Sequence, residues 1–187
     1  MCSLFFVSSN YNKFLEIKSI MKNRLSSTKL KFYRVALPEI QSNNIELISI
    51  EKSKSAYSIS KAPVLIEDDG LFIKSLNGFP GPYSSFIYDT IGNNGVLKLM
   101  KGIKDRKAWF KSIFVYNDGT MIKLFYGEIN GKISSRMSDG GWGFDPIFIP
   151  EKSRMSMGKL HKKAEKNKYS HRGIALEKFI DWYNNIR

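Results

Sequence analysis

The first third of the chain alternates between short apolar runs and helical patterns. Leu4–Val7 is a short apolar run that ends in polar residues, which is typical of a buried strand. After it, Phe14, Ile17 and Met21 have the spacing of one buried helix face. Three further segments have the pattern of a strand, a helix and a strand: Lys31–Val35, Ser49–Ser60 and Pro63–Asp68. This order predicts an α/β layered domain.

The second half of the chain has a different pattern. Residues Lys107–Ile133 alternate between apolar and polar, and the two breaks, Asn117-Asp118-Gly119 and Asn130-Gly131, predict hairpin turns. The last segment predicts a helix with one apolar face: Ala175, Phe179, Trp182 and Ile186. We expect a mixed sheet with helices on both faces, in a single domain that covers residues 1–187.

Composition limits the class of protein. The chain has 187 residues, of which 42% are hydrophobic and 13% aromatic, which suits one folded domain and argues against disorder. No apolar run approaches the roughly 20 residues that span a bilayer. The first residues lack the basic leader of a signal peptide, and the single Cys2 cannot form an internal disulfide. We therefore expect a cytoplasmic protein without a membrane partner.

The charge is strongly positive. Lys and Arg number 30 against 17 Asp and Glu, a formal net charge of +13. Such a charge attracts polyanions, which include nucleic acid, anionic membranes and nucleotide phosphates. The basic residues are spread along the chain, with one local concentration from Lys152 to Arg172. A solvated basic surface explains the charge equally well.

A polar segment, Ser8 to Lys13, joins the first strand to the first helix. The N-terminus of a helix presents unpaired N–H groups and a positive dipole, so small residues there let a phosphate approach. Lys13 adds a cation one turn into the helix. Alternatively, Ser9 or Asn10 simply caps the helix.

Acidic residues follow the third strand. Glu67, Asp68 and Asp69 are consecutive, and Glu39 lies in an earlier loop. Adjacent carboxylates repel one another unless a cation or a proton neutralises them. Together with a phosphate substrate, they suit Mg²⁺, which takes one or two protein carboxylates and keeps several waters. A solvated acidic turn before Gly70 is the alternative.

Three other segments contain candidate functional residues. The two prolines and two glycines of Asn77–Ser85 predict a rigid loop with a structural role. In Gly140–Pro146, Trp142 and Phe144 could stack on a base or belong to the core. Lys166–Gly173 places cations before the last helix, where the dipole disfavours them, and this conflict favours a phosphate or purine site.

Taken together, these segments resemble a known family. The stretches SSNYNKFLEI, LPEIQ, EDDGLFIKSLNGFPGPYSS, GWGFDPIFIP and EKNKYSHRGIAL match the inosine/xanthosine triphosphate pyrophosphatase family in order and spacing, from near residue 8 to near residue 176. The resemblance implies a two-lobed α/β fold, with an elongated mixed central sheet flanked by helices and a nucleotide cleft between the lobes. It also implies a homodimeric, Mg²⁺-dependent hydrolase of acid anhydrides. This enzyme would convert ITP, dITP and XTP to the monophosphate and pyrophosphate without needing nucleic acid.

The resemblance also implies roles for individual residues. The phosphate-binding loop falls on Ser8, Ser9, Asn10 and Lys13. The metal ligands are Glu39 and Asp68, and Asp68 is also the catalytic residue that orients or deprotonates the water attacking the α-phosphorus. The base-stacking loop comprises Trp142, Gly143, Phe144 and Asp145. Further substrate contacts come from Lys166, Ser170, His171 and Arg172.

Selectivity for the base requires a hydrogen-bond donor to the C6 carbonyl of hypoxanthine or xanthine. Arg172, His171 or a backbone N–H could supply it. Such a donor would reject the amine of adenine, because a buried donor left unpaired costs about 1–3 kcal/mol.

Two positions depart from the family's pattern. Asp69 stands where the family usually has Ser or Thr, so it adds charge near the substrate or supplies another ligand. Lys159 stands in place of a glutamate. These departures keep open a catalytically weakened nucleotide-binding protein, and the net charge keeps open a nucleic-acid-binding protein whose affinity would fall steeply with salt. A related pyrophosphatase of similar fold that acts on other bases is a further alternative.

Overall fold

The computed structural model describes residues 2–22, 24–25, 28–163 and 165–186. The side chain of Cys2, the single cysteine of the chain, lies outside the described part. The chain divides into two compact units. The first comprises Met1–Asp68, Ser112–Gly127 and Arg172–Arg187, and the second comprises Asp69–Lys111 and Glu128–His171.

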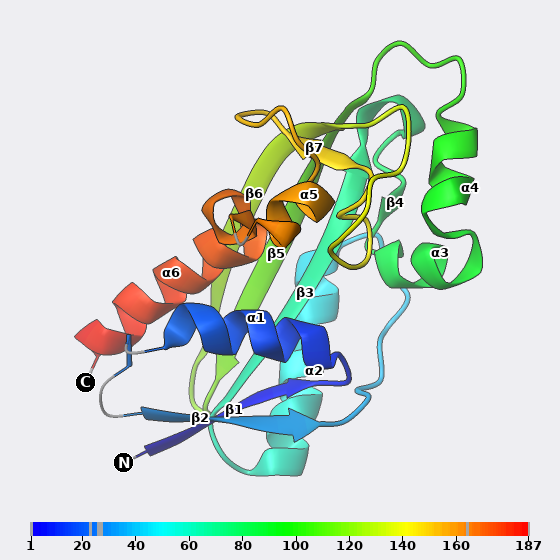
Figure 1. Cartoon of the computed structure of the whole chain (residues 1–187). Coiled ribbons are helices and arrows are strands. Elements are labelled where there is room, and N and C mark those ends of the chain that lie inside the picture. Colours follow the sequence, from blue (N-terminus) through cyan, green and yellow to red (C-terminus); the bar gives the residue numbers. More distant parts are fainter. Residues whose placement is uncertain (1, 23, 26–27, 164, 187) are drawn as a thin grey trace. The chain divides into compact units, whose positions relative to one another are not determined.

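The first unit contains the alternating elements that the sequence predicts (Figure 1). In chain order they are β1 (Cys2–Ser8), α1 (Tyr11–Met21), β2 (Thr28–Arg34), α2 (Ile45–Ser60) and the first half of β3 (Val64–Ile73). The two strands β2 and β3 both pair in parallel with β1. The predicted β-α-β-α-β order is therefore confirmed.

The described residues form a seven-stranded sheet in the order β2-β1-β3-β5-β6-β7, with β4 paired to β3. The later strands are β4 (Pro80–Gly81), β5 (Lys107–Asn117), β6 (Ile122–Ile133) and β7 (Phe148–Pro150). The pairs β3–β4 and β6–β7 are antiparallel, so the sheet is mixed, as predicted. Each of β3, β5 and β6 contributes residues to both units.

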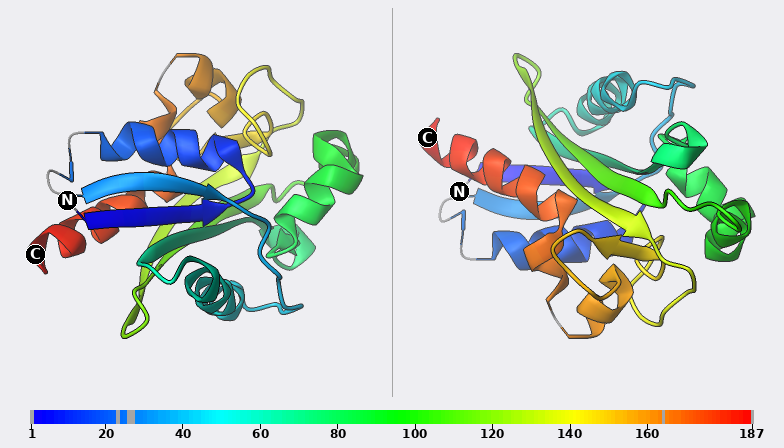
Figure 2. Two further views of the ribbon diagram at one scale, coloured as in Figure 1. Left: turned by 90° about the horizontal axis from the view of Figure 1, so that it is seen from below. Right: turned by 90° about the horizontal axis from the view of Figure 1, so that it is seen from above.

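Two hydrophobic clusters cover opposite faces of the sheet in the first unit. One contains Leu65 and Phe114 with α1 and α6 (His171–Asn185), and the other contains Ile66 and Ile113 with α2. Successive residues of a strand point to opposite faces of the sheet. Leu65 and Phe114 therefore belong to one cluster, and their sequence neighbours Ile66 and Ile113 belong to the other. Figure 2 shows α1 and α2 on opposite sides of β1 and β2.

The last helix buries a different stripe from the one predicted. Ala175 and Phe179 are fully buried, but Ile186 follows the end of α6 and is 49% exposed. Tyr183 takes its place in the core at 1% exposure. Ala175, Phe179 and Tyr183 follow one another at intervals of four residues, so they lie on one face of α6. Ile186 would lie near that face only if the helix continued past Asn185.

The predicted turn at Asn117-Asp118-Gly119 joins β5 to β6, but the predicted turn at Asn130-Gly131 is wrong, because both residues lie inside β6. Gly131 pairs with Pro150 on β7. A Cβ atom at Gly131 would lie 2.3 Å from the Ile149 carbonyl oxygen. The glycine therefore permits close approach of a neighbouring strand rather than a turn.

The second unit has its own hydrophobic cluster, which includes Leu71, Phe110 and Phe148. Its helices are α3 (Ser84–Thr90), α4 (Gly92–Leu99) and α5 (Met157–Lys162), with short 3₁₀ turns at η1 (Lys74–Leu76) and η2 (Lys166–Tyr169). None of the helices in the described residues has both the length and the apolar character needed to cross a bilayer.

The Asn77–Ser85 loop is held against β3 in this unit. The Ser84 hydroxyl accepts a hydrogen bond from the Leu71 N–H at 2.8 Å and donates one to the Gly81 carbonyl at 2.7 Å. At Gly70 a Cβ atom would lie 2.5 Å from the same carbonyl oxygen. These contacts give the loop the structural role that the sequence predicts.

Candidate functional site

The segment before α1 is an N-cap. Asn10 Oδ1 accepts hydrogen bonds from the N–H groups of Asn12 at 3.0 Å and Lys13 at 3.3 Å, and its own N–H donates to Ser8 Oγ at 3.1 Å. Ser9 is exposed. Of the two predicted capping residues, Asn10 is therefore the cap, and two amide groups of the first turn are already engaged.

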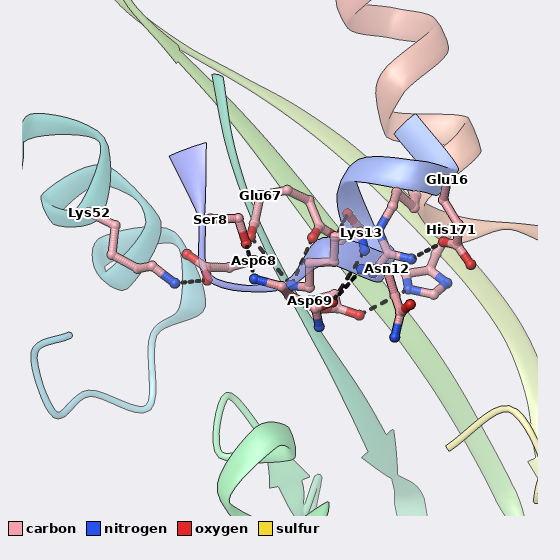
Figure 3. A network of polar contacts seen from close by, with 12 residues as sticks. Ser8, Asn12, Lys13, Glu16, Lys52, Glu67, Asp68, Asp69 and His171 are labelled. Carbon is pink, nitrogen blue, oxygen red and sulfur yellow. Dashed lines mark hydrogen bonds and ion pairs between the residues drawn. The ribbon is translucent and has the colours of Figure 1, made fainter. Parts of the chain in front are cut away.

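The Lys13 side chain leads from this turn to a buried carboxylate. Its Nζ lies 2.8 Å from Glu67 Oε2, and the Glu67 side chain is 0% exposed (Figure 3). Ser112 Oγ donates to Glu67 Oε1 at 2.6 Å. A buried charge needs both a counterion and hydrogen bonds. Lys13 supplies the counterion for Glu67, and Ser112 supplies a hydrogen bond.

Arg172 completes this network from the start of α6. Its Nε donates to Glu67 Oε1 at 3.2 Å, and its Nη1 contacts a carboxylate oxygen of Glu16 on α1. The Arg172 side chain is 1% exposed. The guanidinium thus ties β3, α1 and α6 together within the first unit.

A second network in the first unit contains the predicted metal ligands. The Nζ atom of Lys52, on α2, lies 2.7 Å from Glu39 Oε1. It also contacts Asp68 Oδ1, as Figure 3 shows. Glu39 is 58% exposed, whereas Lys52 and Asp68 are largely buried. Two carboxylates from distant parts of the sequence therefore share one cationic partner.

Burial and neighbouring charges shift the pKa values of Asp68 and Lys52. Loss of solvent raises the pKa of Asp68 above its ordinary value, and the positive charges of Lys52 and Lys13 only partly offset this effect. For Lys52, burial works to lower the pKa, but the carboxylates of Asp68 and Glu39 outweigh it, so the pKa is raised. The lysine therefore stays charged while Asp68 becomes a stronger base than an exposed aspartate.

The donor set fits a hydrated divalent cation. Asp68 Oδ2 is buried and has no hydrogen-bond partner in the described part of the chain. Among the described residues there is no group of three or more His, Cys, Asp or Glu that could hold a metal. Mg²⁺ commonly uses only one or two carboxylates and completes its shell with water and substrate phosphate, so Glu39 and Asp68 suit it.

In the second unit, Asp69 and His171 form a pair. His171 Nε2 lies 3.5 Å from Asp69 Oδ2, and the imidazole is stacked on the Phe110 ring at a centroid distance of 4.6 Å. His171 is 3% exposed. Its Nδ1 is buried and has no hydrogen-bond partner among the residues described. Asp69 and Phe110 are thus the contacts of the two ends of this arrangement: a carboxylate beside Nε2 and an aromatic ring stacked on the imidazole.

A buried ion pair joins the Gly140–Pro146 segment of the second unit to η2. Lys166 Nζ lies 2.8 Å from Asp145 Oδ2 and 4.9 Å from the centre of the Trp142 ring. The same carboxylate oxygen accepts the Trp142 N–H at 3.1 Å. Asp145 therefore links the Lys166 ammonium to the backbone of Trp142.

The other residues predicted in this region are mostly enclosed. Phe144 is 5% exposed and belongs to the hydrophobic cluster, whereas Trp142 is half-buried. The Gly143 carbonyl accepts a hydrogen bond from Asn93 Nδ2 at 3.0 Å, and Ser170 is 2% exposed. Of the two aromatic rings in the loop, Trp142 therefore has the more open face.

Sequence analysis missed Lys52, Glu16 and Ser112. Lys52 precedes the buried Ala56 by four residues, so the helical period places both on one face of α2. That spacing could have indicated an inward lysine. No local pattern identifies Glu16 or Ser112, since their partners Arg172 and Glu67 are distant in the sequence.

Comparison with known proteins identifies the family of the chain. The model of the Ham1 family matches residues 4–182. A dITP/XTP pyrophosphatase of Saccharolobus solfataricus is 43% identical over 177 residues, which are 94% of this chain and 91% of that protein. A dITP/XTP pyrophosphatase of Thermococcus kodakarensis is 40% identical and is matched over 96% of both chains.

Solved structures give the same result. The Ham1 protein of Staphylococcus aureus has a TM-score of 0.84 and 25% identity, with 99% of this chain and 100% of that chain covered. A HAM1 protein from Coxiella burnetii has a TM-score of 0.83 and 26% identity, with the same coverage. The chain belongs to the Ham1 family.

Proposed function

We propose that this protein is a Mg²⁺-dependent pyrophosphatase that hydrolyses dITP, XTP and ITP to the monophosphate and pyrophosphate. One structural observation carries the proposal. Glu39 and Asp68 present carboxylate oxygens to the same cation, and Asp68 has a buried oxygen with no hydrogen-bond partner in the described residues. The family membership and the names of the relatives give the substrate class.

Asp68 is the proposed catalytic base. Burial raises the pKa of its carboxyl group, which makes the carboxylate a better acceptor for a proton of the attacking water. Mg²⁺ bound at Glu39 and Asp68 would neutralise charge on the phosphates. Asp68 thus orients or deprotonates the water that attacks the α-phosphorus, and pyrophosphate leaves.

The predicted phosphate-binding residues are Ser8, Ser9, Asn10 and Lys13. Asn10 caps α1 and so fixes the first turn, while the Glu67 carboxylate fixes the ammonium of Lys13. We assign Lys13 to the negative charge of the leaving pyrophosphate. Ser8 and Ser9 let the phosphate approach because their side chains are small.

Residues of the second unit are assigned to the base. The face of Trp142 provides a stacking surface, and Lys166 and Asp145 fix that loop. Phe144, Gly143 and Ser170 shape the same region. His171 Nδ1 and Asp69 complete the set. Arg172 belongs to the first unit, and its guanidinium binds Glu16 and Glu67. A hydrogen bond from Arg172 to the C6 carbonyl would therefore compete with these two carboxylates.

The chain is also proposed to form a homodimer in the cytoplasm. Large apolar side chains are exposed in and beside α3, where Phe86 is 65%, Ile91 43% and Tyr83 41% exposed. A surface of this kind marks a protein–protein contact, and a second copy of the chain is the expected partner. Sedimentation velocity measures the mass directly, and a monomer at all concentrations would contradict this part.

The activity is tested by pyrophosphate release from ITP, XTP, dITP, ATP and GTP, with Mg²⁺ and with a chelator. We expect metal-dependent release that favours the first three nucleotides. Asp68→Asn should lower kcat by about a hundredfold or more. Asp118→Asn, a change in the β5–β6 turn, is the matched control and should leave the rate unchanged. Absence of release from every nucleotide would overturn the proposal.

A further inference from the structure

Lys52 contacts both of the proposed metal ligands. Its Nζ lies 2.7 Å from Glu39 Oε1 and contacts Asp68 Oδ1 as well. Figure 3 shows the side chain extending from α2 to Asp68 at the end of a dashed contact. The lysine side chain is 14% exposed, so solvent screens these contacts only weakly.

In this arrangement Lys52 is the counterion of the buried Asp68 carboxylate. The Asp68 side chain is 13% exposed, and a buried carboxylate without a counterion is strongly destabilising. Glu39 adds a second negative charge close to the same ammonium. One buried cation therefore compensates both carboxylates when no metal is present.

The same arrangement opposes metal binding. An ammonium in contact with these oxygens repels a divalent cation and blocks its access to the carboxylates. Before Glu39 and Asp68 can bind a metal, the Lys52 ammonium must move away from them. A binding-competent state that is only fractionally populated lowers the apparent affinity by that fraction.

We propose that Lys52 is the internal counterion of the metal site and exchanges with Mg²⁺ at Glu39 and Asp68. The inference rests on the proposed function, because it takes these two carboxylates as the metal ligands. Lys52 has a flexible stem and three N–H donors, so the displaced ammonium remains available to phosphate oxygens. Lys52 is thus a positioning residue that keeps metal affinity low until a nucleotide supplies its own charge.

The test measures Mg²⁺ binding without nucleotide by isothermal titration calorimetry. We expect Lys52→Met to bind Mg²⁺ about tenfold more tightly than the unmodified protein, or better, because a buried opposing charge is gone. Lys54→Met is the matched control, since Lys54 lies on the same helix and pairs with Glu51 at 2.7 Å on the surface. This control should leave the affinity unchanged.

Thermal unfolding gives a second readout. Lys52→Met should lower the Tm of the metal-free protein, and Mg²⁺ should raise it by a larger step than in the unmodified protein. If Lys52→Met does not fold, Lys52→Gln serves instead, since it keeps one hydrogen-bond donor and removes the charge. Lys52→Arg keeps the charge and should retain the weak affinity.

The outcomes separate the two proposals. Equal Mg²⁺ affinity in Lys52→Met, Lys54→Met and the unmodified protein would overturn the counterion role. If Asp68→Asn still abolished binding in that case, the proposed metal site would stand. No Mg²⁺ binding by any of these proteins, together with nucleotide hydrolysis in chelator, would overturn the metal site and the counterion role together.

Discussion

At the scale of single residues, removing the charge of a buried carboxylate lowers the free energy of unfolding more than removing that of an exposed one. Glu67 is enclosed and pairs with both Lys13 and Arg172, so Glu67→Gln removes the negative charge that these two buried cations share, and Arg172 keeps its contact with Glu16. We expect the free energy of unfolding to fall by about 3–5 kcal/mol. Urea denaturation at neutral pH measures the change.

The control for this prediction is Glu177→Gln. Glu177 pairs with Arg24 at 2.5 Å on the surface of the same unit. An exposed ion pair contributes little, so this variant should stay close to the unmodified protein. Equal losses in the two variants would show that burial does not set the cost.

We predict that Asp69 controls which nitrogen of the His171 ring carries the proton. The carboxylate favours a proton on Nε2, which lies 3.5 Å from Asp69 Oδ2. Asp69→Ser should weaken this preference and change the ring-nitrogen NMR signals of His171. The chain has only two histidines, and the exposed His161 is an internal reference whose signals should not change. Unchanged signals for both rings would remove the positioning role of Asp69.

The residue scale also shows what sequence alone could provide. Motif resemblance identified Glu39 and Asp68, because these stretches have characteristic neighbours. It did not identify Lys52, which completes the same network. The lysine belongs to an ordinary helical pattern, and its two contacts span 13 and 16 positions of the sequence.

At the scale of the elements, one turn couples stability to pH. In the turn between β5 and β6, burial works to raise the pKa of Asp118. Hydrogen bonds from the Thr120 hydroxyl and from the N–H groups of Met121 and Thr120 outweigh it and lower the pKa below the ordinary 3.8. The folded pKa is lower than the unfolded one, so the carboxylate stabilises the fold above the unfolded value. This stabilisation is lost as the pH falls through the folded value.

Asp118→Asn should remove this contribution. The amide oxygen can still accept hydrogen bonds, but it does not titrate. The difference in unfolding free energy between the two proteins should therefore be constant above about pH 5 and shrink as the pH falls through and below the ordinary pKa of 3.8. Urea midpoints at several pH values measure the difference, and a gap that stays constant as the pH falls through this value would contradict the prediction.

Elements were predictable where the pattern is local. The period of Phe14, Ile17 and Met21 identifies the buried face of α1, and all three are buried. The hairpin turn predicted at Asn130-Gly131 was wrong, because Gly131 instead allows the backbone of β7 to approach closely. No local sequence pattern shows that contact.

At the scale of the whole molecule, the order of strands and helices was predictable from the sequence pattern. Two lobes were expected only from the family resemblance, and no pattern indicated where the two units divide. Three strands each supply residues to both units, so the boundaries fall inside regular elements, where composition does not change. The net charge of +13 likewise has no local explanation. The family resemblance supplied what composition could not, namely which scattered polar residues to propose as one site.

The most direct test of the central claim is hydrolysis of dITP in water labelled with heavy oxygen, followed by mass spectrometry of both products. Attack by water on the α-phosphorus places the label in the monophosphate and leaves the pyrophosphate unlabelled. We predict this result, with the rate lost in Asp68→Asn. Label in the pyrophosphate, or release of inorganic phosphate, would contradict the proposed reaction and the role of Asp68 in it.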